Sequence, residues 1–126
     1  MASLSWLHAL AVAVGAALGA LLRWGATWAW STPGSTMPLG TLAVNCIGGL
    51  LAGMAMVWFQ RTPHEVLRLL CVTGFLGGLT TFSAFSAESL ILLQKGHYWG
   101  ALGHTLAHVL GALACAALGF KLGRLL

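Results

Sequence analysis

Residues 74–88 read GFLGGLTTFSAFSAE, a combination that an ordinary membrane-spanning helix does not need. Three glycines lie within the first five positions, and two threonines and two phenylalanines follow. The stretch lies inside an apolar segment, 66–93, that would be about 42 Å long as one unbroken helix. The hydrocarbon core of a bilayer is only about 30 Å thick. We therefore expect this segment to be tilted, interrupted, or both.

The order of residues places an interruption near the middle of the segment. Gly74, Gly77 and Gly78 precede Thr80 and Thr81. Non-helical backbone at membrane depth persists only where protein buries it or water lines it. It also frees carbonyl oxygens, which are suitable ligands for a small cation. A glycine-rich packing contact without a break is the alternative, and residue spacing alone leaves both interpretations open.

The overall composition is that of an integral membrane protein. Of 126 residues, 59% are hydrophobic and 6% are charged, whereas soluble domains carry about 25% charged residues. Long uncharged apolar runs are typical of membrane spans. We predict an all-α membrane protein, a single domain over 1–126 that crosses the bilayer four times. The four predicted transmembrane helices cover about 4–30, 39–59, 66–93 and 98–120.

Polar, turn-rich stretches separate these spans. They are STPGSTMP (31–38), QRTPHE (60–65) and QKGH (94–97), and KLGRLL closes the chain after span four. The N-terminal run resembles a secretory signal only superficially, because it lacks a basic beginning and its apolar pattern continues to Arg23 and Trp24. We therefore take it as the first span.

The positive charge of the chain relates to the membrane rather than to nucleic acid. The formal net charge is +4, but the six basic residues are scattered at span ends and form no patch. The side that carries both termini has Arg61, Arg68, Lys121 and Arg124, and the other side has Lys95 and Arg23. Basic residues favour the cytoplasmic side. Because the excess is small, we expect that the chain can insert in both orientations.

Glycines also recur at spacing four, a pattern that lets helix backbones approach closely. The pairs are Gly15/Gly19, Gly49/Gly53, Gly74/Gly78 and Gly119/Gly123. They indicate tight packing either within one chain or between chains. Four thin helices are too few to enclose a pore comfortably, so we also expect an oligomer.

Phenylalanines and hydroxyl residues alternate after the predicted break. Phe82 and Phe85 share a helical face at spacing three, and Ser83 and Ser86 share the adjacent face, with Glu88 beyond. Such phenylalanines ordinarily face the core or lipid. A phenyl ring has a positive edge, however, so an edge-on ring with hydroxyl donors beside it can hold an anion without a fixed charge.

These motifs resemble the signature of the Fluc family of fluoride channels. The resemblance extends over the whole chain: its size, its four spans, Arg23 in span one, GTLAVN (40–45) in span two and the run 74–88 in span three. It implies a channel that passively exports fluoride from the cytoplasm of a prokaryote across the inner membrane. It further implies a dual-topology, antiparallel homodimer with two pores, in which neutral donors and ring edges replace the water around fluoride.

The resemblance also implies roles for particular residues. A structural sodium ion at the dimer centre is expected on the backbone carbonyls of Gly77 and Thr80. The ring edges of Phe82 and Phe85 are expected to face permeating fluoride. The other matching positions are Asn45, Thr41 one turn before it, Ser83, Arg23 and Glu88. Interhelical hydrogen bonding is the plain alternative for the polar groups of span two. Arg23 either extends to the interface or concentrates anions in a vestibule, and Glu88 is either a protonated donor or a structural partner.

Span four places His104, His108 and Ala112 on one face, at spacing four. In relatives this face carries polar groups along the fluoride pathway, so we predict that both histidines line the pore. Ala112 offers no side-chain donor, which interrupts a continuous polar track. Two histidines at this spacing also fit a transition-metal pair, but we identify no carboxylate or cysteine near them that would complete a site.

Other functional classes fit the sequence less well. A four-span multidrug-type transporter coupled to protons is the main alternative, but span one contains no carboxylate and Glu88 is the sole acid within a span. A non-transporting assembly subunit would leave Asn45, Phe82 and Phe85 without a role. We predict no enzyme, because no nucleophile–base pair or metal set stands out.

The three cysteines lie singly in three different spans: Cys46, Cys71 and Cys115. We interpret them as small apolar residues rather than disulfide partners.

Overall fold

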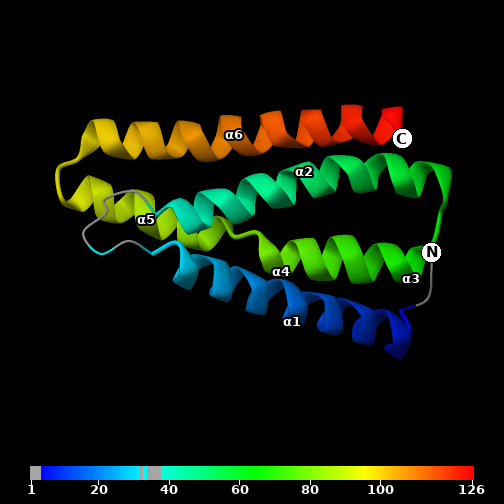
Figure 1. Ribbon diagram of the computed structural model, residues 1–126. Helices are drawn as coiled ribbons and strands as arrows, with labels where there is room; N and C mark the ends of the chain where they lie inside the picture. Colours follow the sequence, from blue (N-terminus) through cyan, green and yellow to red (C-terminus); the bar gives the residue numbers. More distant parts are fainter. Residues whose placement is uncertain (1–3, 32, 34–37) are drawn as a thin grey trace.

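The structure, a computed structural model, describes residues 4–31, 33 and 38–126, and its described part is built from helices (Figure 1). Four helical stretches are long and apolar enough to cross a membrane: Trp6–Ala29, Leu39–Arg61, Glu65–Gln94 and Tyr98–Leu125. The prediction of an all-helical protein with four spans is thereby confirmed. Most of the turn-rich stretch 31–38 lies outside the described residues.

Three of the four spans are single helices, and the third is composite. The single helices are α1 (Trp6–Ala29), α2 (Leu39–Arg61) and α6 (Tyr98–Leu125). The third span consists of α3 (Glu65–Arg68), the wider π-helical η1 (Leu69–Leu76), α4 (Gly77–Leu79) and α5 (Phe82–Gln94). Helix α6 continues five residues beyond the predicted end at 120. The Arg61 guanidinium donates to the carbonyls of Gly123 and Arg124 there and ties this last turn to α2.

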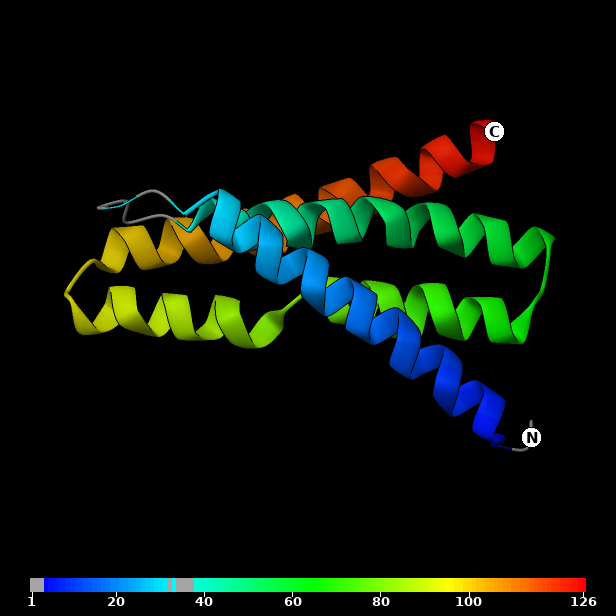
Figure 2. The same cartoon turned by 60° about the horizontal axis from the view of Figure 1, so that its bottom comes forward.

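The third span is interrupted at Thr80 and Thr81, as the sequence predicted. Both residues are extended, with φ/ψ of −86°/154° and −148°/119°. The Thr81 hydroxyl accepts from the Ala84 N–H at 3.1 Å and so caps the N-terminus of α5. Figure 2 shows the resulting offset between the α4 and α5 halves. The glycines before the break remain helical, so they do not themselves open the backbone.

Two of these glycines instead serve the packing contact that the sequence left open as an alternative. A Cβ at Gly74 would lie 2.7 Å from the Val12 carbonyl oxygen, and one at Gly78 would lie 3.0 Å from the Ala20 nitrogen. Gly15 and Gly19 on α1 face the same contact. Helix α1 therefore crosses closely over η1 and α4, as Figure 2 shows.

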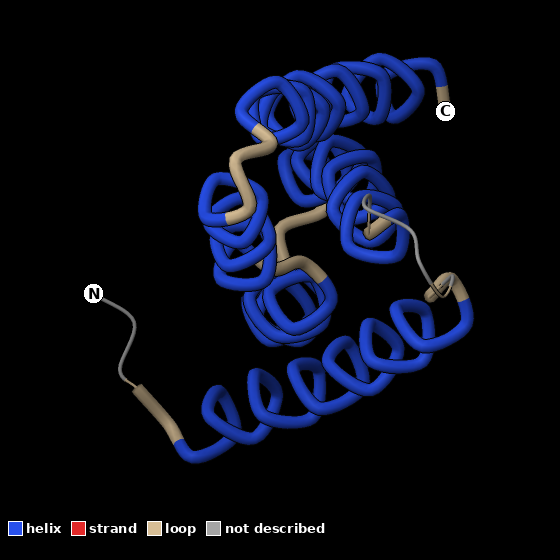
Figure 3. Tube along the Cα trace, turned by 90° about the vertical axis from the view of Figure 1, so that its left-hand side faces the viewer, coloured by secondary structure: helices blue, strands red, loops and turns tan. Residues whose placement is uncertain are grey.

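The remaining glycine pairs bring α2 against α6 within the same chain. Gly49 approaches the Ala112 backbone, Gly53 approaches Ala116, and Gly119 lies against Leu50. In the end-on view of Figure 3, the third span lies between α1 and α6. The start of α1, the end of α6 and the turn between α2 and α3 lie at one end of the bundle (Figure 1), which agrees with the predicted four-span topology.

The α2–α6 contact yields a test on two glycines of the same helix. We expect Gly119→Ala to destabilise the protein by about 1–3 kcal/mol, because its methyl group would press on the Leu50 backbone. Gly103→Ala is the matched control, since a Cβ there meets nothing within 4 Å. It should stabilise α6 by about 0.5–1 kcal/mol. Thermal unfolding of the purified variants in detergent measures both effects. Equal unfolding temperatures for Gly119→Ala and Gly103→Ala would contradict this packing.

Candidate functional site

Asn45 on α2 holds the interrupted backbone of the third span. Its Nδ2 donates to the Thr81 carbonyl at 3.0 Å, and its Oδ1 accepts from the Thr81 N–H at 2.8 Å. This pair of bonds satisfies backbone groups that a continuous helix would have satisfied internally. One side chain from a neighbouring helix therefore stabilises the break.

The same contacts release two carbonyl groups next to the break. In an unbroken helix the N–H of Thr81 would bond to the carbonyl of Gly77, and that of Ala84 to the carbonyl of Thr80. Here those two donors bond to Asn45 Oδ1 and Thr81 Oγ1 instead. The carbonyls of Gly77 and Thr80 are the pair expected to bind sodium, and carbonyl oxygens suit such a cation. The intervening Gly78 carbonyl accepts from Arg23 Nε at 3.0 Å.

Phe85 is the centre of an aromatic cluster that spans α5 and α6. It is 8% exposed, and its ring centroid lies 5.3 Å from that of Phe82 in an edge-to-face arrangement. Its other neighbours are His108, at 4.7 Å, and His104, at 5.5 Å. Phe82 in contrast is 77% exposed. Of the two predicted pore phenylalanines, Phe85 is thus buried and Phe82 is exposed.

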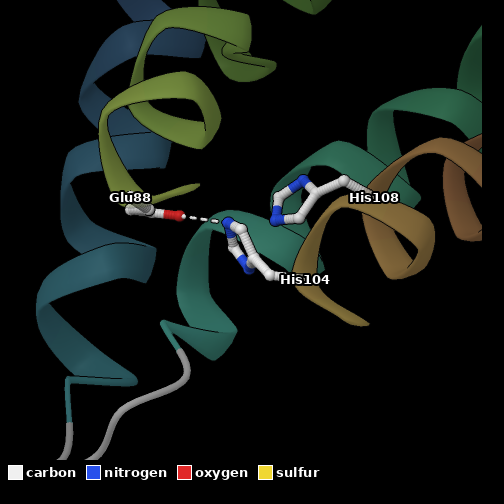
Figure 4. Close-up of side chains that lie close together, drawn as sticks. All are labelled: Glu88, His104 and His108. Carbon is white, nitrogen blue, oxygen red and sulfur yellow. Dashed lines mark ion pairs between the residues drawn. The ribbon is translucent and has the colours of Figure 1, made fainter. Parts of the chain in front are cut away.

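Glu88 joins α5 to both α2 and α6. Its Oε1 accepts from the Thr41 hydroxyl at 2.6 Å, and its Oε2 lies 3.2 Å from His104 Nε2 (Figure 4). Thr41 and His104 are almost completely buried. Glu88 is therefore a structural partner of both residues, one of the two roles that the sequence left open.

Asn45 also selects the form of the His108 ring. Its Nδ2, which carries hydrogens, lies 3.0 Å from His108 Nδ1. The bonds to Thr81 fix the orientation of the Asn45 amide, so Nδ1 of the neutral ring is the acceptor and Nε2 carries the proton. His108 Nε2 is buried and has no hydrogen-bond partner among the described residues. The Nε2–H group is therefore a donor without an acceptor among the described residues.

Several of these groups line a groove of about 510 Å³. Its polar wall comes from Asn45, Thr80, Thr81 and His108, and its aromatic wall comes from Phe82 and Phe85. Gly77 and Ala112 lie along it as well. Hydroxyl and imidazole donors beside aromatic rings can replace part of the hydration of a small anion.

The structure brings most of the predicted site residues together and leaves two to one side. Thr41, Asn45, Phe82, Phe85, Glu88, His104 and His108 form one connected set. Ser83 is exposed, with its hydroxyl 3.1 Å from that of Thr81. Arg23 bonds to the Gly78 carbonyl, a contact that differs from both roles considered for it. Cys46, Cys71 and Cys115 are free thiols, as expected.

One sequence-based argument was wrong, and one residue was missed. We identified no carboxylate near the two histidines, yet Glu88 contacts His104, because the α5–α6 hairpin folds the two helices side by side. Thr81 was named only as part of the break, whereas it is the partner of Asn45. The detectable signal was a threonine directly before FSAF, where a helix N-cap belongs.

The sequence matches the family described as CrcB-like protein, Camphor Resistance (CrcB), over residues 10–120. A "Fluoride-specific ion channel FluC" of Cupriavidus pinatubonensis is 50% identical over 119 residues, which cover 93% of this chain and 94% of the relative. Proteins of the same name from Aromatoleum aromaticum and Bordetella petrii are 52% and 51% identical. Those matches cover 88% and 90% of this chain and 86% and 88% of the relatives.

Proposed function

Because the chain belongs to the CrcB-like family, we propose that it is a fluoride-selective ion channel that lets fluoride leave the cell passively. It is a multi-pass membrane protein, and such an activity belongs in the inner membrane of a bacterium. One observation carries the proposal: relatives about half identical over nearly the whole chain bear the name fluoride-specific ion channel. The family is one of channels, so the protein is not an enzyme.

The groove supports a mechanism in which protein donors replace water around the ion. Fluoride is small and strongly hydrated, so each lost water must be replaced by a donor of similar strength. The Nε2–H of His108 is an oriented donor without a protein partner among the described residues, whereas both amide hydrogens of Asn45 are used by Thr81 and His108. The positive edges of Phe82 and Phe85 add attraction without a full charge. Neutral groups bind strongly enough to admit the ion and weakly enough to release it.

A second copy of the chain covers the groove in this proposal. Backbone and polar side chains at membrane depth require protein or water around them, and Thr80, Thr81 and Asn45 line an open surface. Phe82 is 77% exposed on the same surface. Two chains related by a two-fold axis in the membrane plane would bury these groups and enclose two pathways. The small excess of basic residues on one side supports insertion in both orientations.

A sodium ion at the centre of this dimer would be held by the carbonyls of Gly77 and Thr80 from both chains. Bound there, it supplies positive charge that holds the two broken helices together. This assignment is supported by the side chains of Asn45 and Thr81. They accept from the two backbone N–H groups that would bond to these carbonyls in an unbroken helix. Gly77 also lies on the groove, and a Cβ at this position would meet only the Val72 carbonyl, at 3.9 Å.

Removal of sodium should therefore weaken the dimer. Any ion bound by the folded form alone stabilises it, by about 2.7 kcal/mol at a hundred times its dissociation constant. We expect a lower unfolding temperature and more monomer when sodium chloride is replaced by N-methyl-D-glucamine chloride at equal ionic strength. Thermal unfolding and size-exclusion chromatography measure this. An unchanged dimer in thoroughly sodium-depleted buffer would contradict the sodium site.

Anion efflux from liposomes tests the function itself. Liposomes containing purified protein are loaded with fluoride or chloride, and external ion-selective electrodes follow each anion. We expect rapid passive loss of fluoride and negligible loss of chloride. Absence of fluoride efflux from protein that is folded and dimeric would overturn the proposal. Proton-coupled multidrug transport, the alternative from the sequence, is not favoured by the names of the relatives.

A further inference from the structure

We propose that Glu88, His104 and His108 form a binding site for a divalent transition metal ion of the Zn²⁺ type. This site is distinct from the carbonyl groups of Gly77 and Thr80, which suit a hard cation such as sodium. Occupancy of the site inhibits the channel, and only this second part rests on the proposed function.

The three side chains converge from two helices on one point. Glu88 comes from α5, and the two histidines are one turn apart on α6. One ligand atom from each of the three lies within 4.8 Å of the others. Figure 4 shows the carboxylate and both rings directed toward one another. Zn²⁺ holds nitrogen and oxygen ligands at about 2.0–2.2 Å, so small side-chain rotations would bring all three within reach of one ion.

Unpartnered atoms mark the same point independently of this distance. Glu88 Oε2, His104 Nε2 and His108 Nε2 are buried and have no hydrogen-bond partner among the described residues. Glu88 Oε2 and His104 Nε2 lie 3.2 Å apart, which is an ion-pair distance. His104 is 1% exposed and His108 is 4% exposed. Buried polar atoms without partners are rare in folded proteins, and here three of them face each other.

The ligand set selects the class of ion. Two imidazoles and one carboxylate are typical of zinc sites that keep a fourth position open for water or another ligand. Imidazole nitrogen favours Zn²⁺, Cu²⁺ and Ni²⁺, whereas Mg²⁺ and Ca²⁺ prefer oxygen ligands. The site should therefore discriminate strongly against the alkali and alkaline-earth ions.

Asn45 sets an upper limit to the affinity. A metal on His108 Nε2 would require the ring proton to move to Nδ1, where it would face the Asn45 amide nitrogen. Metal-bound histidines normally donate their other N–H to an acceptor, and loss of such a partner costs about 10–100-fold in metal affinity. We therefore expect a reversible, inhibitory site rather than one that is permanently filled.

The position of the site explains how an ion would reach it and act. His108 and Phe85 lie on the groove that we propose as part of the fluoride pathway. The Glu88 side chain is 19% exposed and offers access from its own side. A bound ion removes the His108 Nε2–H from the donors available to fluoride. It also places a cation that binds anions strongly in the pathway. Fluoride that arrives there is therefore retained instead of passing.

Direct binding to the full-length protein, after removal of any histidine tag, tests the site without reference to flux. Titration with Co²⁺ should produce the visible absorption of a four-coordinate ion at one ion per chain, and calorimetry with Zn²⁺ should give the same stoichiometry. Glu88→Gln and His104→Gln should each weaken binding at least tenfold. His97→Gln is the matched control, because His97 is exposed and lies just before α6, outside the cluster. It should bind as the unaltered chain does.

Variant behaviour separates a specific site from surface binding. Glu88→Gln keeps the side-chain volume and an acceptor for Thr41, so it is the variant most suited to folding normally. Its dimer peak and unfolding temperature are measured alongside. The proposal is overturned if Zn²⁺ at 1 mM does not bind the unaltered chain. It is also overturned if Glu88→Gln and His104→Gln bind like His97→Gln.

Fluoride efflux in the presence of Zn²⁺ tests the inhibition. We expect Zn²⁺ to slow efflux from liposomes at least tenfold, EDTA to restore it, and Mg²⁺ to have no effect. Efflux that Zn²⁺ leaves unchanged at concentrations that saturate binding would overturn the inhibitory role. If the unaltered protein carries no fluoride at all, the proposed function fails, and the binding titration still decides the metal site.

Discussion

Replacement of Phe85 with leucine is expected to reduce fluoride efflux by more than about tenfold while leaving the dimer folded. The buried ring contacts Phe82, His104 and His108. Aromatic contacts of this kind contribute about 0.5–1.5 kcal/mol each, and about 1.4 kcal/mol corresponds to a tenfold change in rate. Leucine fills a similar space without a positive ring edge. The neighbouring rings would lose their fixed positions, and the anion would lose an attractive wall.

Phe75→Leu provides the matched control for this experiment. Phe75 is another phenylalanine of the third span, but it is only partly buried and packs on the core of Val44, Leu76 and Leu79 rather than on the groove. Efflux is measured for both variants in liposomes at equal protein content, and unfolding temperature is measured in detergent. Equal efflux by Phe85→Leu and the unaltered chain would exclude a role for this ring in conduction. Equal loss in both variants would point to general destabilisation instead.

Asn45→Asp is expected to abolish fluoride efflux, with a fall of about a thousandfold or more. The carboxylate keeps an acceptor for the Thr81 N–H but has no donor for the Thr81 carbonyl or for His108 Nδ1. Each buried group left unsatisfied costs about 1–3 kcal/mol. In addition, a negative charge 4 Å from a passing anion repels it by about 4 kcal/mol at an effective dielectric constant of 20. That repulsion alone corresponds to about a thousandfold in rate.

Ser89→Ala is the control for the removal of a buried polar group. The Ser89 hydroxyl is buried on α5 and has no hydrogen-bond partner among the described residues. Its loss should leave both efflux and unfolding temperature nearly unchanged, whereas Asn45→Asp should lower the unfolding temperature as well as efflux. Fluoride efflux from Asn45→Asp within a factor of three of the unaltered chain would contradict the placement of Asn45 beside the pathway.

The predictions from sequence were most successful where a property depends on neighbouring residues in the chain. Phe82 and Phe85 were expected on one face, and the structure places their rings edge to face. His104 and His108 were likewise expected on one face of a helix, and both are buried together. Helical periodicity specifies which residues share a face. It does not specify which other helix that face meets, so the contact between His104 and Glu88 was missed.

The glycines show the same difference between local and tertiary information. Their spacing indicated close packing, but it did not distinguish contacts within the chain from contacts between chains. The structure assigns contacts of Gly15, Gly19, Gly74 and Gly78 to the crossing of α1 with the third span. An interruption was expected near Gly74, Gly77 and Gly78, yet these glycines remain helical and the break follows them.

The sequence by itself determined the four spans and an excess of length in the third that favours an interruption near its middle. Both follow from local quantities: the length of each apolar run against the thickness of a bilayer, and the two threonines before FSAF. The tertiary structure alone decided what completes the break. The freed N–H and carbonyl of Thr81 need partners in an apolar surrounding, and Asn45, 36 positions earlier in the chain, supplies both. Only the packing of α2 beside the third span brings that amide within hydrogen-bonding distance of Thr81, and the same amide also contacts His108 Nδ1.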